Sequence, residues 1–252
     1  MKLGTIRHKN LNNGKKTEIK YPISDTEFKN QFAEIFVANQ YGKGKVKDAV
    51  YMDLGSNIGM TALYFQEYAK KYYAIEPSKQ CFEALQYNTR NMKNIEHFNY
   101  AVSSMNNDEW IYQTAKDSTV QNFFAPTQGM IYNKELTKCK TLETIFKENK
   151  IDHIDVLKID IEGMEFLVFG EKSFGKVADK IDMIIGEAHW NIVFGGIPML
   201  IPQMLEQWGF KTEWIELDPP NMAYTLTITN QDGTEKRYDH WMNTIFVAKK
   251  IK

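Results

Sequence analysis

The sequence predicts a doubly wound α/β fold built on a mostly parallel sheet. Short apolar runs alternate with segments of helical periodicity along most of the chain, and this alternation is typical of βαβ units with right-handed crossovers. The C-terminal part is rich in β-forming residues and contains the turn sequence Asn230-Gln-Asp-Gly233. We therefore expect the sheet to finish with an antiparallel strand.

The alternation gives the expected elements in chain order. We expect strands at residues 50–54 and 72–76, a further strand ending near residue 102, and helices at residues 57–69 and 78–92. The pattern resumes with a helix at 142–148, a strand at 156–159, a helix at 163–169, a strand at 181–185 and a helix at 198–208. The β-rich tail covers residues 211–217, 222–229 and 243–249.

The N-terminal residues differ from this pattern. Residues 1–20 hold six basic residues and one acid, which predicts a solvated arm or a short hairpin. Phe28, Phe32 and Phe36 then follow at helical spacing behind a Ser/Asp cap, so we expect an amphipathic helix. We predict that residues 1–47 form an arm and helix that pack on a single domain of residues 48–252.

Residues 108–139 interrupt the alternation. They contain one expected strand at residues 110–113 and a polar stretch at residues 118–129 without a clear period. We interpret this insertion as a candidate lid over the site.

Composition and charge exclude several classes of protein. Lysine and arginine number 31 and aspartate and glutamate 32, so the chain has no strong field for a polyphosphate or an anionic membrane. Nucleic acid is therefore not an expected partner. Cys81 and Cys139 are too few for a disulfide framework and lack metal-ligand spacing. Together with a polar N-terminus that lacks a secretory apolar core, they predict a cytoplasmic protein.

One uncharged stretch, residues 188–205, is long enough to cross a bilayer. It contains Pro198, Pro202 and a pair of glycines, which would break a helix and leave backbone groups unsatisfied in lipid. We therefore expect no membrane span.

The densest chemical signal is the string Asp53-Leu-Gly55-Ser-Asn57-Ile-Gly59 between an expected strand and helix. Glycines at such a turn let the backbone approach a ligand, and the helix start offers free N–H groups. The dinucleotide fingerprint GxGxxG is absent, and an acid at the strand end suits a ligand with an ammonium and a sulfonium. The string favours S-adenosylmethionine over NAD. Tight packing of the turn is the alternative explanation for its glycines.

A second acid, Glu76, ends the next expected strand about twenty residues later. Doubly wound folds place a carboxylate here that accepts hydrogen bonds from ribose hydroxyls. Pro77 ends the strand behind it. We predict that Glu76 binds the cofactor ribose.

The chain resembles the FkbM family of S-adenosylmethionine-dependent methyltransferases. The resemblance runs from residue 50 to residue 189 and is carried by YMDLGSNIGMTALYF, YYAIEPS, NYAVSS, KTLETIF, DVLKIDIEGMEFLVFG and MIIGEAHW. It implies a Rossmann-like class I methyltransferase fold of seven strands with the last one antiparallel. It also implies S-adenosylmethionine as cofactor and O-methylation of hydroxyls on sugars or other natural products, hence a small-molecule or glycan acceptor.

The resemblance also assigns the cofactor site. The loop from Asp53 to Gly59 would hold the methionine end, Glu76 the ribose, and the segment Ala101-Val102-Ser103 the adenine edge through its backbone. The predicted cofactor-binding residues are Asp53, Gly55, Ser56, Asn57, Gly59, Glu76, Val102, Ser103 and Asp160.

Acidic residues follow the expected strand at 156–159. Asp160 stands at its carboxyl end, where open α/β sheets place their cleft, and Lys158 shares its strand face. We predict that Asp160 acts in catalysis and that Lys158 and Glu162 contact the acceptor. Glu165 can serve the site or only complement the dipole of the following helix.

Glu187 and His189 follow the expected strand at 181–185 and alternate onto one face. A hydroxyl is a poor nucleophile at neutral pH, so a base that removes its proton would raise the rate by roughly a hundred- to ten-thousand-fold. We predict catalytic roles for His189 as the base, and for Glu187 and Asp160, with His189 also contacting the acceptor. The same three residues could instead gather a divalent metal, which is possible but is not our prediction.

The predicted function is therefore that of an S-adenosylmethionine-dependent O-methyltransferase. Two alternatives remain open at this point: an NAD-type Rossmann oxidoreductase, and a non-catalytic S-adenosylmethionine-binding protein. Titration with the two cofactors and an assay of methyl transfer distinguish them.

Overall fold

The structure is a computed structural model of the chain. It describes residues 3–9, 16–22, 31–113, 122–123, 131, 133–189, 198–215, 223–229, 235–241 and 243–251. The first turns of the expected N-terminal helix, most of the candidate lid and the turn at residues 230–233 lie outside the described residues.

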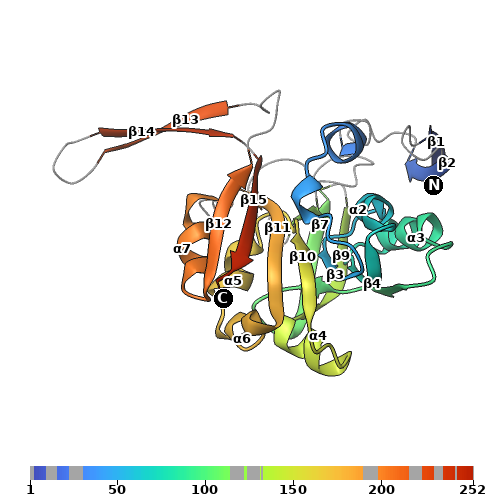
Figure 1. The fold of residues 1–252 in the computed structure, drawn as a ribbon. Helices are drawn as coiled ribbons and strands as arrows, with labels where there is room; N and C mark the ends of the chain where they lie inside the picture. Colours follow the sequence, from blue (N-terminus) through green and yellow to red (C-terminus); the bar gives the residue numbers. More distant parts are fainter. Residues whose placement is uncertain are drawn as a thin grey trace.

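A seven-stranded sheet forms the centre of the fold, in the order β12-β15-β11-β10-β3-β4-β5 (Figure 1). Its strands are β3 (Ala49–Leu54), β4 (Ala69–Ile75), β5 (Ile95–Phe98), β10 (Ile154–Ile159), β11 (Ile181–His189), β12 (Phe210–Ile215) and β15 (Asn243–Lys250). Neighbouring strands from β5 to β11 pair in parallel, and β15 runs antiparallel to both β11 and β12. The predicted fold class and the antiparallel last strand are confirmed.

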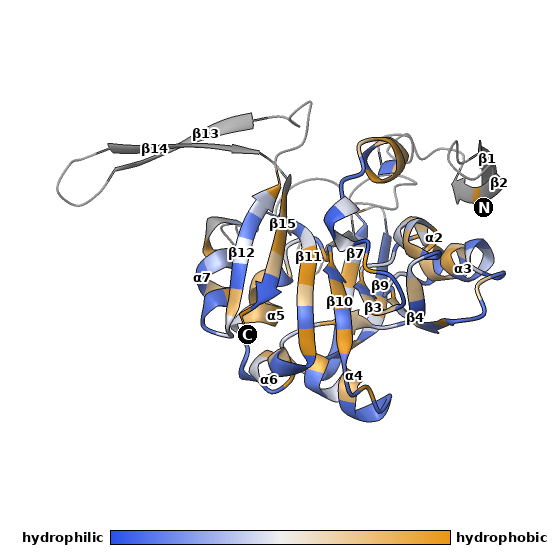
Figure 2. Ribbon diagram, viewed as in Figure 1, coloured by the Kyte–Doolittle hydropathy of each residue, from blue (hydrophilic) through white to orange (hydrophobic). Residues whose placement is uncertain are grey.

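Helices cover the sheet because its strands bury apolar side chains on both faces. In β3, Met52 and Leu54 belong to one core cluster, whereas Tyr51 belongs to the other. The first cluster includes residues of α4 (Leu142–Glu148), α5 (Glu165–Gly170), α6 (Lys172–Gly175) and α7 (Ile201–Glu206). The second includes residues of η1 (Ala33–Val37), α2 (Met60–Phe65) and α3 (Lys79–Asn88). Figure 2 shows the apolar residues concentrated on the central strands.

Several boundaries differ from the expected ones. The helix expected at residues 57–69 begins only at Met60, because residues 55–59 form the loop that precedes it. The strand expected at 181–185 continues to His189, because β15 pairs with β11 as far as His189. Glu187 and His189 therefore lie within β11 and not behind it.

The strand expected to end near residue 102 is split in two. The main sheet ends with β5 at Phe98, and β6 (Ala101–Val102) pairs with β9 (Asn133–Lys140) instead. These strands form a second sheet in the order β6-β9-β7-β8, with β7 (Asn107–Gln113) and β8 (Asn122–Phe123). The described residues of the insertion thus lie mainly in a small sheet that also includes β6.

Two hairpins complete the described elements. β1 (Leu3–Lys9) pairs with β2 (Lys16–Pro22), and β13 (Ala223–Thr229) pairs with β14 (Glu235–Trp241), each as a two-stranded antiparallel sheet. The expected strand at 222–229 therefore pairs with β14 and does not join the main sheet. Short helical turns lie at Gly42–Gly44, Ala178–Lys180 and Pro198–Leu200. No helix among the described residues combines the length and apolar character that a bilayer crossing requires.

Candidate active site

The carboxyl ends of β3, β4, β10 and β11 place the predicted site residues at one edge of the sheet. Asp53 in β3 is paired with Lys158 in β10, and Lys158 is paired with Ile185 in β11. Because these strands are parallel and in this register, the residues that follow them emerge side by side. The loop after Asp53, Glu76, Asp160 and the end of β11 therefore surround a common region.

Asp53 is an internal anchor of this edge. Its side chain is fully buried, and its Oδ2 accepts hydrogen bonds from the hydroxyls of Thr61 at 2.6 Å and Tyr72 at 2.8 Å. Its Oδ1 lies 3.2 Å from the amine of Lys158. These contacts occupy the carboxylate with protein partners, so its contribution to a cofactor site is to hold the loop that follows it.

Lys158 joins three parts of the edge. Its Nζ donates to the carbonyl oxygen of Gly55 at 2.9 Å and forms ion pairs with Asp53 at 3.2 Å and Asp160 at 3.3 Å. Burial alone would lower the pKa of Lys158, but Asp53, Asp160 and Glu187 together raise it, so the amine stays charged. With its side chain 3% exposed, Lys158 supports the site from beneath, whereas the sequence suggested direct contact with the acceptor.

The loop after β3 needs its glycines for packing. Gly55 has a φ of +79°, and a Cβ there would lie 1.9 Å from the carbonyl oxygen of Asp160. Gly59 has a φ of +88°, and its Cβ would lie 2.8 Å from Cδ1 of Leu85. Ser56 bonds through its hydroxyl to the carbonyl oxygen of Asp53 at 3.0 Å. The packing explanation considered above therefore applies to both glycines.

Glu76 is the carboxylate best placed for a ribose. It directly follows β4 and is 6% exposed, and its two oxygens accept the backbone N–H groups of Asn57 and Ser78, each at 2.8 Å. Each oxygen retains a second lone pair, so the fixed carboxylate can still accept two hydroxyl donors. Burial raises the pKa of Glu76 to about 7. The residues present thus fit the ribose of a nucleoside cofactor at this position.

The predicted adenine edge lies on β6. Val102 is 3% exposed and Ser103 is 9% exposed, and the N–H of Ser103 donates to the carbonyl oxygen of Lys140. At the end of β5, Asn99 donates from its side chain to the carbonyl oxygens of Glu76 and Pro77, each at 2.9 Å. The third strand of the parallel set therefore ends at Phe98 and is followed by Asn99, ahead of the segment that the resemblance indicated.

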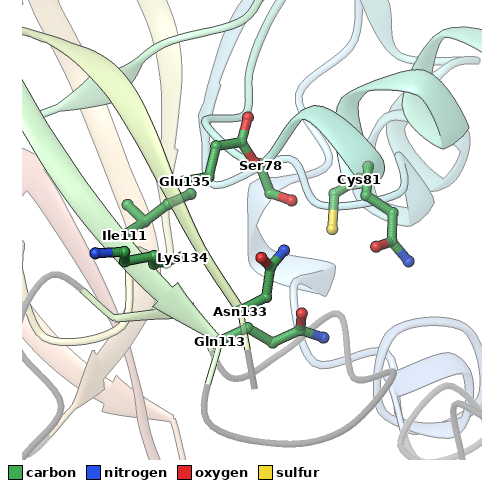
Figure 3. A pocket seen from close by; sticks show the side chains of 8 residues that line it. Ser78, Cys81, Ile111, Gln113, Asn133, Lys134 and Glu135 are labelled. Atoms are coloured by element: carbon green, nitrogen blue, oxygen red, sulfur yellow. The ribbon is translucent and has the colours of Figure 1, made fainter. Parts of the chain in front are cut away.

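A pocket lies between the start of α3 and the second sheet (Figure 3). Its lining includes Ser78, two residues after Glu76, together with Ile111 and Glu135. The carboxylate of Glu135 accepts the N–H of Lys79 at 3.2 Å. The insertion therefore packs against the first turn of α3, next to the predicted ribose site.

His189 lies at the centre of an acidic cluster. Its Nδ1 lies 3.0 Å from Oε1 of Glu165, which is fully buried and also accepts the N–H of Ile161. With Nδ1 bonded to this carboxylate, Nε2 faces Asp160 and Glu187, each 3.7 Å away. Oε2 of Glu162 lies 4.0 Å from the same nitrogen. The structure thus brings together four acids and a histidine that sequence analysis had placed after two different strands, at residues 156–159 and 181–185.

The cluster shifts the pKa values of its members upward. Burial lowers the pKa of His189, but the bond to Glu165 and the charges of Glu162 and Asp160 raise it well above its usual 6.5. Burial raises the pKa of Glu162 to about 8, and burial and the charge of Asp160 raise that of Glu187 to about 7. Glu162 and Glu187 can therefore exchange protons near neutral pH, and His189 holds its proton more strongly than a free imidazole does.

Two residues from outside the predicted site hold Glu187. The amide Nε2 of Gln40 and the hydroxyl of Tyr41 both donate to its Oε1, the hydroxyl at 2.9 Å. Burial and the charge of Glu187 raise the pKa of Tyr41, so its hydroxyl keeps the proton that it donates. Sequence reasoning assigned these residues to a connecting segment and had no spacing signal that linked them to β11.

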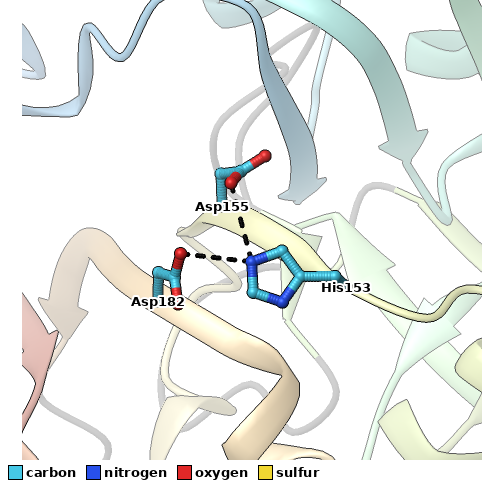
Figure 4. A group of neighbouring side chains, drawn as sticks. All are labelled: His153, Asp155 and Asp182. Atoms are coloured by element: carbon cyan, nitrogen blue, oxygen red, sulfur yellow. Dashed lines mark hydrogen bonds and ion pairs between the residues drawn. The ribbon is translucent and has the colours of Figure 1, made fainter. Parts of the chain in front are cut away.

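The side chains can also be compared with metal sites. One oxygen each from Asp160 and Glu162 and one nitrogen of His189 lie within 4.8 Å of one another, a donor set that suits a divalent cation. The sequence alternative named Asp160, His189 and Glu187. A second group, His153, Asp155 and Asp182, lies at the opposite edge of the sheet (Figure 4).

The second group has a structural explanation. Nε2 of His153 lies 3.1 Å from Oδ2 of Asp182 and 3.5 Å from Oδ1 of Asp155. Asp155 also accepts the N–H of Val50 at 2.6 Å. These contacts join the starts of β3, β10 and β11, away from the candidate active site.

A parallel sheet with β15 antiparallel, with acids at the ends of β3, β4 and β10 and within the end of β11, defines a Rossmann-like class I methyltransferase fold. The family described as the methyltransferase FkbM domain matches residues 53–212. The chain belongs to this family, which confirms the resemblance found in the sequence.

Solved structures with a similar arrangement share little sequence with the chain. Precorrin 8W decarboxylase from Methanobacterium thermoautotrophicum is 13% identical, with 85% of this chain and 89% of that chain covered and a TM-score of 0.46. Precorrin-6y C5,15-methyltransferase from Geobacter metallireducens is 12% identical, with coverages of 85% and 87% and a TM-score of 0.45. A Streptococcus mutans protein in complex with SAH is 11% identical, with coverages of 92% and 99% and a TM-score of 0.43. No curated protein gives a match.

Replacement of Lys158 should destabilise the fold strongly. Lys158→Met leaves the buried Asp53 without its counter-charge, and we expect the free energy of unfolding in urea to fall by about 3–5 kcal/mol. Lys71→Met is the control, because Lys71 pairs with Glu96 at the partly exposed surface of β4, where loss of a pair costs at most about 1 kcal/mol. Equal losses in the two variants would contradict the anchoring role of Lys158.

Gly55 can be tested against a glycine of similar backbone conformation. Gly209 has a φ of +78°, and a Cβ there would approach only the flexible side chain of Lys250, at 3.4 Å. Gly209→Ala should therefore cost about 1–2 kcal/mol of unfolding free energy, the cost of a left-handed conformation. Gly55→Ala should cost clearly more, because its Cβ also meets backbone. Urea unfolding of both variants decides, and a similar cost for both would argue against close packing at Gly55.

Proposed function

We propose that this protein is an S-adenosylmethionine-dependent O-methyltransferase acting on a hydroxyl of a sugar, glycan or other natural product. The observation that carries the proposal is the pair Glu165–His189, which lies at the same carboxyl edge of the sheet as Asp53 and Glu76, with β10 between β11 and β3. A histidine oriented by a buried carboxylate is the arrangement of a general base. Family membership favours methyl transfer over the oxidoreductase alternative.

The chain's own residues would divide the work as follows. Glu76 would accept the ribose hydroxyls, and the loop after Asp53, held by Lys158, would enclose the amino-acid end. S-adenosylmethionine, when bound, supplies an activated methyl group. Nε2 of His189 would take the proton of the acceptor hydroxyl, while Nδ1 stays bonded to Glu165. Asp160 and Glu187 would stabilise the positive imidazolium that results.

The negative charge around His189 favours an acceptor that is not a polyanion. Asp160, Glu162 and Glu187 line the region around Nε2 of His189 and would repel phosphates. The chain as a whole carries 31 basic and 32 acidic residues. A neutral or cationic small molecule or glycan is therefore the acceptor class that we propose, in preference to a nucleic acid.

Cofactor affinity should depend on pH through Glu76. Its pKa is about 7 without ligand, and hydroxyl donors favour the ionised form, so binding should strengthen as the pH rises from 6 to 8. Calorimetric titration with S-adenosylmethionine measures this. Glu76→Gln should weaken binding at pH 8 by about 1.5–3 kcal/mol and flatten the pH dependence. An unchanged affinity in the variant would remove Glu76 from the ribose site.

Turnover should depend on His189 and on the carboxylate that orients it. The label transferred from radioactive S-adenosylmethionine to fractionated extract of the source organism measures turnover. His189→Ala should lower it roughly 100- to 10,000-fold without changing cofactor affinity. In the wild type, turnover should fall toward acid pH with a midpoint above 6.5, since the pKa of His189 is raised. Glu165→Gln should move this midpoint downward, because it removes the charge that raises the pKa.

A chelator separates this mechanism from the metal alternative. If His189 is the base, a chelator leaves the wild type active, and Asp160→Asn is less damaging than His189→Ala. If a divalent metal is required, the chelator abolishes transfer and the two variants are equally damaged. A wild-type protein that binds the cofactor but labels no fraction would instead indicate a non-catalytic binding protein.

A further inference from the structure

The segment that precedes β3 donates hydrogen bonds to Glu187, near the end of β11. Gln40 and Tyr41 are 3% and 1% exposed, and both donate to Oε1 of Glu187 across sequence separations of 147 and 146 residues. Nζ of Lys158 lies 5.8 Å from the centre of the Tyr41 ring. The two residues are therefore packed between the N-terminal segment and the candidate active site.

The turn that carries these residues is fixed from its other side. The N–H of Gly44 donates to the carbonyl oxygen of Tyr41 at 2.9 Å. The hydroxyl of Tyr51, a buried residue of β3, donates to the carbonyl oxygen of Gly44 at 2.8 Å and accepts the N–H of Val46 at 2.9 Å. The donors that reach Glu187 thus come from a turn attached to the central sheet.

This arrangement determines which way the Glu187 carboxylate faces. Because both donors bind Oε1, the other oxygen, Oε2, is left 3.7 Å from Nε2 of His189. We propose that Gln40 and Tyr41 are positioning residues that hold Glu187 against His189. Both lie outside residues 53–212, the part of the chain that matches the family.

The positioning role rests on the proposed function. The acceptor oxygen would gain the methyl group as the sulfur–methyl bond of bound S-adenosylmethionine breaks and leaves a neutral thioether, and the hydroxyl proton would pass to Nε2 of His189. The imidazolium formed would need a negative partner. Oε2 of Glu187 is that partner only while Oε1 is held away from His189. The hydrogen bond from Tyr41 to Oε1 also lowers the pKa of Glu187 against the effects of burial and Asp160, which favours the ionised carboxylate.

Crystal structures test the positioning without any acceptor. In the variant Gln40→Leu/Tyr41→Phe, we expect the Glu187 carboxylate to leave its position beside His189. Tyr73→Phe is the control, since it also removes a tyrosine hydroxyl but lies in β4, which β10 and β3 separate from β11. Glu187 should stay in place in this control. If Glu187 keeps its position when both donors are removed, the proposal is wrong.

Rates of methyl transfer test whether the position of the Glu187 carboxylate affects catalysis. With radioactive S-adenosylmethionine and the fractionated extract, Tyr41→Phe should lower label transfer about tenfold, whereas Tyr73→Phe should leave it near the wild-type rate. Calorimetric affinity for S-adenosylmethionine should stay unchanged in both. In a Glu187→Gln background, Tyr41→Phe should cause no further loss, because its effect passes through Glu187.

The outcomes separate the two proposals. Equal rates for Tyr41→Phe and the wild type, or a full further loss in the Glu187→Gln background, would overturn the positioning role while methyl transfer stands. A wild type that transfers no label would overturn the proposed function. In that case the crystal structures still decide whether Gln40 and Tyr41 hold Glu187.

Discussion

The candidate site depends on the buried amine of Lys158. It is the point at which the end of β3, the loop after it and the end of β10 meet, through Asp53, Gly55 and Asp160. A charge removed from water costs several kcal/mol unless it is paired and fully hydrogen-bonded. The amine satisfies that requirement only when the two strand ends lie in one arrangement. Loss of either partner would leave a buried charge uncompensated, so the edge depends on the ion pair being complete.

The sequence could predict most of the fold and the location of the site. Apolar runs and helical periods can be recognised within a short segment of sequence, because they show which of its side chains are buried. The central strands were therefore placed correctly. Asp53, Glu76 and Asp160 were assigned to one cleft because parallel strands share a carboxyl edge. Glu187 and His189 were placed on one face by their alternation, which the longer β11 preserves.

The remaining features depend on contacts that local patterns do not encode. Gln40 and Tyr41 are separated from Glu187 by 147 and 146 residues of sequence, and no spacing rule connects them to it. The sequence left open whether Glu165 serves the site or complements the dipole of α5, and the contact between Glu165 and His189 in β11 is seen only in the structure. Val102 was assigned to the main sheet because a short apolar strand shows no preference between partners, whereas the structure pairs it with β9.

The position of β15 has a consequence for how the protein is made. Among the described residues, β12 pairs with β15 alone, and one edge of β11 is open until β15 occupies it. During synthesis the N-terminal parts of a domain leave the ribosome first. β11, which contains Glu187 and His189, therefore emerges with an unpaired edge. This edge stays unpaired until residues 243–250 have been made. The sheet is completed, and the end of β11 is fixed, only after β15 has been translated. Until then the open edge of β11 can be bound by chaperones or pair with other nascent chains.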